Sequence, residues 1–188
     1  MKIFLAILIL IFSLQSWSKA DDIRDFEIEG ISIGNSLLNY FSEKEILNTK
    51  ANWYNDNKYS TSQLTLKKYE IFKDLDISYL TSDKNYIIVG FSAIHSDADK
   101  NNCKSIQNEI VSDISKMFSV RVIKETLTHP IDKSGKSKVD VADFDLKDGS
   151  RVGVQCFYFS DNVSFNDGLK ISIVTPDFID WMANVAYK

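Results

Sequence analysis

Two cysteines are the residues with the clearest chemical options in this chain of 188 residues. Cys103 and Cys156 could form a disulfide bond, or one of them could act as a nucleophile with His95 or His129 as its base. The disulfide is favoured because the cysteine count is even, the chain begins with an export signal, and neither cysteine has the sequence context of a catalytic cysteine. We therefore predict a Cys103–Cys156 bond and expect no catalytic residue, with a cysteine nucleophile as the alternative.

Oxygen ligands for a metal occur together at one place in the sequence. The stretch DADKNN puts Asp97, Asp99 and Asn101 at the first three ligand positions of a calcium loop. The loop departs from that motif, because its sixth position is Asn102 instead of glycine and its twelfth is Asn108 instead of glutamate. The two histidines have no partner at the spacing of a known zinc motif. We expect no metal site and interpret DADKNN as a polar loop that ends in a helix cap, with calcium binding as the alternative.

Lysines gather in a third candidate segment, THPIDKSGKSK. Lys133, Lys136 and Lys138 surround Gly135, but the glycine spacing differs from that of a phosphate-binding loop. A solvated, mobile loop is expected here, with contact to an acidic partner as the alternative. The chain has no G-x-S-x-G elbow, no H-E-x-x-H motif and no dinucleotide fingerprint, so we expect no cofactor.

The first twenty residues, MKIFLAILILIFSLQSWSKA, predict export. A lysine precedes an apolar core at residues 3–12, and Ser18 and Ala20 occupy the two small-residue positions of a cleavage site. The apolar run is shorter than the roughly 20 residues of a membrane-spanning helix. We expect residues 1–20 to be a cleaved signal peptide, with an uncleaved anchor as the alternative. The product is then a periplasmic or secreted domain over residues 21–188 with no membrane span.

Composition limits the classes of partner. The chain has 22 basic and 26 acidic residues, and cleavage after residue 20 leaves 20 basic and 26 acidic residues, a formal charge of −6. An acidic exported domain has no electrostatic attraction to nucleic acid or to anionic lipid. An apolar fraction of 44% with seven glycines and two prolines is typical of a globular protein.

Alternating apolar residues predict a β-sheet. Both faces of YIIVGFSAI, residues 86–94, are apolar, which is typical of a central strand. Asp148-Gly149 lies between two alternating segments and is a strong hairpin signal. Further strands are predicted at residues 69–71, 77–79, 120–127, 139–146, 152–158 and 169–173.

Helical spacing predicts two longer helices and a broken one. Apolar residues recur every three or four positions over 103–118, and Pro176 follows the capping residue Thr175 at the start of a terminal helix. The apolar stripe of the terminal helix is expected to pack on the sheet; it comprises Phe178, Trp181, Met182 and Val185. Near the N-terminus, DFEIEGISIGNSLLNYFSEKEI predicts a strand that bends at Gly30 and leads into a broken helix at one end of the sheet.

These elements predict an α+β fold. The expected architecture is an antiparallel sheet of about six or seven strands with two helices packed on one face.

Two parts of the chain carry a resemblance to known proteins. The segment Phe26 to Ile46, F-x-I-x-G-I-S-I-G-x-S-L-L-x-Y-F-S-x-x-E-I, and the hairpin DGSRVGVQC resemble an uncharacterised family of small exported proteins from marine alphaproteobacteria of the Pelagibacter type. GISIGNSLLNYF is more distantly similar to the glycine-then-helix entry of BamE-like envelope assembly modules and of β-lactamase-inhibitor-like domains. Asn35 replaces the methionine that usually follows the second glycine, and no lipid-anchor cysteine is present. The resemblance implies an exported protein and no particular activity.

These observations favour a non-catalytic module of the bacterial envelope that binds another envelope protein or a small ligand. Aromatic residues make up 12% of the chain, and Trp53, Tyr54 and Tyr59 are the expected exposed ones. The alternative is a periplasmic hydrolase built from scattered carboxylates. Two convergent acids in a deep pocket, or a histidine near an unpaired Cys103 or Cys156, would favour the enzyme. A flat or grooved aromatic patch together with a closed disulfide would favour the binding module.

Overall fold

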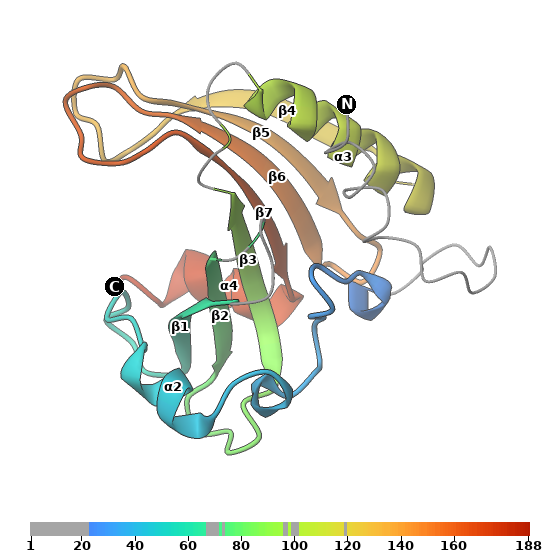
Figure 1. Ribbon diagram of the computed structural model, residues 1–188, viewed down its shortest axis with the longest axis vertical. Helices are drawn as coiled ribbons and strands as arrows, with labels where there is room; N and C mark the ends of the chain where they lie inside the picture. The colour runs from blue at the N-terminus through green and yellow to red at the C-terminus, as the bar shows by residue number, and fades with distance from the viewer. Residues whose placement is uncertain (1–22, 67–71, 73, 96–97, 99–101, 119) are drawn as a thin grey trace.

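A single antiparallel sheet of seven strands forms the framework of the computed structural model (Figure 1). The structure describes residues 23–66, 72, 74–95, 98, 102–118 and 120–188. The expected signal peptide, the predicted strand at residues 69–71 and the three candidate calcium ligands therefore lie outside the described residues. The strands run in the order β1-β2-β3-β7-β6-β5-β4. They are β1 (Tyr59–Thr65), β2 (Asp74–Leu80), β3 (Ile88–His95), β4 (Val122–Thr128), β5 (Lys138–Asp145), β6 (Arg151–Tyr158) and β7 (Gly168–Val174).

Two helices longer than seven residues accompany the sheet, α3 (Cys103–Met117) and α4 (Pro176–Asn184). The shorter helical elements are η1 (Ile23–Asp25), η2 (Leu37–Asn39) and α2 (Glu43–Asn48). An α+β fold with an antiparallel sheet is therefore confirmed. Ser42 and Glu45 form the predicted capping box at the start of α2.

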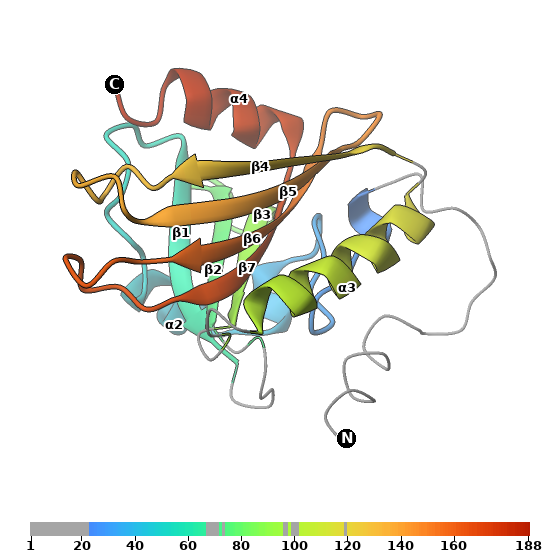
Figure 2. The same ribbon diagram turned by 90° about the horizontal axis from the view of Figure 1, so that it is seen from above.

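The two long helices contact opposite faces of the sheet, which differs from their expected packing on one face (Figure 2). The face that includes Ile171 and Val154 packs with α3. Helix α4 packs on the other face, where a Cβ atom on Gly90 would lie 3.0 Å from the ring of Phe178. Thr175 N donates to Val89 O at 3.0 Å, so the chain turns toward the α4 side as soon as β7 ends. The apolar stripe of a helix predicts that it packs, but not against which face.

Only part of the predicted α4 stripe is buried. Phe178 and Trp181 are almost fully buried, in one cluster with Tyr59, whereas Met182 and Val185 are 37% and 42% exposed. The prediction was therefore wrong for the last two residues: the helix ends at Asn184, and Ala186 instead of Met182 or Val185 joins the cluster of Phe178 and Trp181.

The N-terminal segment covers the α3 side of the core. Its predicted bend is confirmed: Ile28 and Ile31 form an isolated bridge around Glu29 and Gly30, whose φ angles are 54° and 75°. The strand around this bend does not extend beyond that bridge. Ile31 and the first residue of η2, Leu37, are fully buried.

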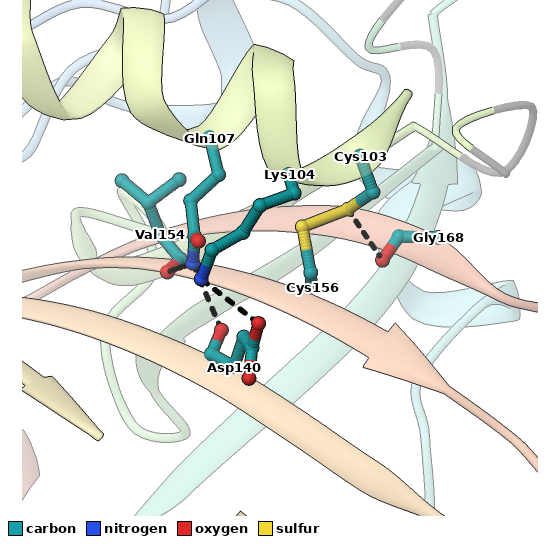
Figure 3. The surroundings of a disulfide bond; sticks show 7 residues. All are labelled: Cys103, Lys104, Gln107, Asp140, Val154, Cys156 and Gly168. Carbon is teal, nitrogen blue, oxygen red and sulfur yellow. Dashed lines mark hydrogen bonds and ion pairs between the residues drawn. A yellow bond between two sulfur atoms is a disulfide. The ribbon is translucent and has the colours of Figure 1, made fainter. Parts of the chain in front are cut away.

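A disulfide joins α3 to the sheet, as predicted (Figure 3). Cys103 and Cys156 are both fully buried, and 53 residues separate them in sequence. One turn further along α3, the buried Gln107 donates from Nε2 to the carbonyl oxygens of Asp140 and Val154, at 2.9 and 2.8 Å. The helix is thus fixed to β5 and β6 by one covalent bond and two hydrogen bonds.

Candidate binding site

The candidate site lies on the face of β4–β7 that points away from α3, here called the open face. Strand alternation places every second side chain on it. Among the described elements, α4 packs against this side only at its far end, next to Val89 and Val174. The open face of these four strands includes Ile123, Glu125, Leu127, Val139, Val141, Asp143, Gly153, Gln155, Phe157, Lys170 and Ser172.

One cross-strand row of the open face is apolar and aromatic. Leu127 pairs with Val139, which pairs with Phe157. The Phe157 ring stacks on Phe159 with centroids 5.9 Å apart, and the imidazole of His129 meets both rings edge-on. The aromatic patch and the Cys103–Cys156 disulfide lie on opposite faces of β6.

A polar cluster occupies the centre of the open face. Lys170 on β7 lies between Asp76 on β2 and Asp143 on β5, with its ammonium 5.1 Å from the centre of the Phe157 ring. Burial lowers the pKa of Lys170 and raises the pKa of both carboxyls. The buried Oδ1 of Asp143 has no hydrogen-bond partner among the described residues. Gly153 leaves room for this carboxylate, because a Cβ atom there would lie 2.8 Å from Oδ1.

Strand β4 is an open edge of the sheet. Six of its seven residues are exposed, and its register with β5 is uninterrupted. His129 N donates to Ser137 O, so these two residues form a hydrogen-bonded pair. Hydrogen-bonded and non-hydrogen-bonded pairs alternate along an antiparallel ladder, so the backbone groups of odd-numbered β4 residues bond to β5. The N–H and C=O groups that point outward belong to Val122, Lys124, Thr126 and Thr128. Within the described part of the chain, no backbone hydrogen bond reaches this outer side.

The opposite edge of the sheet is covered. Ala51 N donates to Thr61 O at 2.8 Å, and Gln63 N donates to Thr49 O at 3.0 Å, so the segment after α2 occupies the outer side of β1. Natural sheets protect their edges in such ways because free edges recruit other strands. The contrast with β4 marks β4 as the edge that is available to a partner.

A cleft of about 520 Å³ lies on the α3 side, next to the β4 edge. Its lining residues are Thr126, Lys136, Lys138, Asp140, Tyr158, Phe159, Ser160, Asp161, Asn162 and Asp167. Thr126 Oγ1 donates to Asp140 Oδ1 at 2.6 Å, and Lys104 donates to Asp140 Oδ2 at 2.8 Å. The Lys104 ammonium is the main cause of the lowered pKa of Asp140.

The lysine-rich loop before β5 contains a buried aspartate that is hydrogen-bonded to serines. Both oxygens of the buried Asp132 accept hydrogen bonds, Oδ1 from Ser134 and Oδ2 from Ser137 and Ser160. These bonds, led by that of Ser134, hold the pKa of Asp132 far below its usual range. Lys133, Lys136 and Lys138 are exposed, as expected of a solvated loop, and the mobility of the loop stays a prediction.

The other residues singled out in the sequence do not come together. His95 ends β3 beside Phe72, while His129 packs in the aromatic patch, and both cysteines are bonded. Tyr59 is buried, contrary to expectation, whereas Trp53 is 43% exposed. Among the described residues, no group of three or more histidine, cysteine or acidic side chains is placed to hold a metal.

Sequence reasoning missed Lys170 and the β4 edge. A lysine inside the apolar strand segment LKISIV, and the mixed polar sequence VIKETLT, were the available signals. No helix in the described part of the chain is long and apolar enough to cross a membrane.

Comparisons with protein-family models, with curated proteins and with solved structures find no match to this chain. The resemblance drawn from the N-terminal segment stays a prediction, and the geometry of the described residues carries the functional argument.

Proposed function

We propose that this protein is a non-catalytic exported module that binds an extended segment of another envelope protein by strand addition at β4. The observation that carries the proposal is the open β4 edge, seven residues long and in unbroken register with β5. An added strand gains affinity from main-chain hydrogen bonds and specificity from alternate side chains.

The surroundings of β4 supply apolar contacts for such a strand. Ile123 and Leu127 are 48% and 46% exposed on the open face, and Leu127 continues into the row of Val139 and Phe157. A side chain of the added strand that lies opposite Leu127 would extend this apolar row by one strand. The Gln107 bonds and the disulfide hold β5 and β6 against α3, so the edge is presented by a rigid sheet.

A second copy of the chain fits this edge less well than another protein does. Antiparallel pairing of all seven β4 residues with their symmetry copies requires a two-fold axis at Glu125, which would lie opposite itself. Like charges directly opposite each other destabilise a strand pair. We therefore assign the edge to a different partner.

Amide hydrogen exchange tests strand addition directly. The probe is a capped nine-residue peptide with the neutral core Ile-Thr-Gln-Gln-Val. Added peptide should protect the amides of Lys124 and Thr126, which point outward, and should leave those of Ile123 and Glu125 unchanged, since they already bond to β5.

Two substitutions at one position provide the matched control. Lys124→Pro removes an outward N–H without removing a bond to β5, whereas Lys124→Thr keeps that N–H. Binding should be lost in the first variant and kept in the second, with both folded by circular dichroism. Equal binding by the two variants, or no protection of outward amides at saturating peptide, would overturn strand addition.

A further inference from the structure

The two sides of the β4 edge carry opposite charge, which restricts the sequence of the strand that can bind there. This inference rests on the proposed strand addition. Side chains of an added strand alternate between the α3 side and the open face, so each side selects its own residues.

The α3 side of the edge is basic. Lys124 is exposed on this side, and Lys138 lies next to the edge, where its ammonium donates to Thr128 Oγ1 at 2.8 Å. Asp140 is the neighbouring acid on β5, and Lys104 neutralises it. The other acids of the cleft, Asp161 and Asp167, belong to the loop between β6 and β7, and β6 is one strand farther from the edge than β5.

The open side of the edge is acidic between two apolar residues. Glu125 lies between Ile123 and Leu127, and its charge contributes to the raised pKa of Asp143 after the larger effect of burial. Two basic residues lie near the Ile123 end of this side: the exposed Arg121, which directly precedes β4, and Arg151, which is bonded to Asp145 at 2.7 Å. A basic side chain opposite Glu125 would therefore meet a carboxylate that forms no ion pair with another described residue.

We infer that the partner strand carries an acidic residue opposite Lys124 and a basic residue opposite Glu125, flanked by apolar residues opposite Ile123 and Leu127. If the partner strand is antiparallel to β4, like the other neighbouring strands of the sheet, its five residues pair with residues 127 to 123 in that order. From its N-terminus to its C-terminus, the partner then reads apolar, polar, basic, acidic, apolar. Residues 123, 125 and 127 would form the close, non-hydrogen-bonded pairs of the new ladder, where side chains interact most strongly.

Two peptides of identical composition test this pattern. Both are capped nine-residue peptides, one with the core Ile-Thr-Lys-Glu-Val and the other with the core Ile-Thr-Glu-Lys-Val. The first should bind the wild-type protein about tenfold more tightly at low salt, since two opposite-charge pairs become two like-charge pairs in the second. The ratio should fall below about twofold near 1 M NaCl, where exposed charges are screened.

A charge-swapped protein makes the test reciprocal. The Lys124→Glu/Glu125→Lys variant should prefer the second peptide by a similar factor, with unchanged circular dichroism. Equal binding of both peptides, with protection of the outward amides, would overturn the charge pattern and leave strand addition intact. Failure of both peptides and of the neutral peptide to protect those amides would overturn strand addition itself. A concentration-dependent dimer that Lys124→Pro abolishes would overturn both by identifying a second copy as the occupant.

Discussion

Reduction of the Cys103–Cys156 bond should destabilise the protein by an amount that follows from its place in the chain. The bond closes a loop with a sequence separation of 53 residues. In the chain-entropy treatment, a loop of this length raises the free energy of unfolding by about 4 kcal/mol. With a urea dependence of about 2 kcal/mol per molar, the unfolding midpoint should fall by roughly 2 M.

The assay compares oxidised protein with protein that was unfolded, reduced and refolded in reductant. Alkylation and intact mass confirm the state of the thiols. Reduced wild-type protein is the better comparison, because it keeps both sulfur atoms in the core, whereas a Cys103→Ala/Cys156→Ala variant adds the loss of buried volume. If oxidised and reduced protein unfold at the same urea concentration, the loop-closure reasoning is refuted.

Three further outcomes are expected. Gln107→Ala should lower the free energy of unfolding by about 1–3 kcal/mol in urea titrations, because it removes two buried hydrogen bonds, while the exposed Asn108→Ala in the same helix should change it by less than about 0.5 kcal/mol. Gly153→Ala should lower the free energy of unfolding by about 1–3 kcal/mol, because the added methyl group crowds Asp143 and Ser172. The double variant with Ser172→Ala should recover part of that loss. An unchanged urea midpoint in the single variant would contradict the close approach. Burial raises the pKa of Asp143, so the folded state binds the carboxyl proton more tightly than the unfolded state does. The protonated carboxyl therefore favours the folded state at low pH, and this stabilisation is lost as the pH rises above about 3.9. Asp143→Asn should therefore lose less stability than the wild type between about pH 4 and pH 7, and parallel pH profiles would argue against a buried carboxylate.

Local sequence signals predicted most elements of the fold. The alternation at residues 139–146 and 152–158, with Asp148-Gly149 between them, became the β5–β6 hairpin, and Gly149 has the positive φ angle of 86° that such a turn requires. Helix α3 and the capping box of α2 followed from spacings of three or four residues, which lie within one turn of chain. The cysteine pair followed from an even count together with the expectation of export.

Predictions failed where the outcome depended on residues far apart in sequence. The side of the sheet on which α4 packs depends on Gly90, a residue of β3 that leaves room for Phe178. The burial of Tyr59 likewise depends on the α4 residues that pack against its ring.

The sequence by itself determined the alternation of strands, the starts of α3 and α4 and the two cysteines that pair, because each depends on residues near each other in the chain or on residue type alone. Only the tertiary structure decided that β7 lies between β3 and β6, and this order brings Lys170 between Asp76 and Asp143. It also decided that β4 is the free edge while the chain after α2 covers β1. The order of strands depends on contacts between segments that are far apart in sequence, and it is stabilised by the burial of whole sheet faces. No short stretch of sequence can therefore specify it.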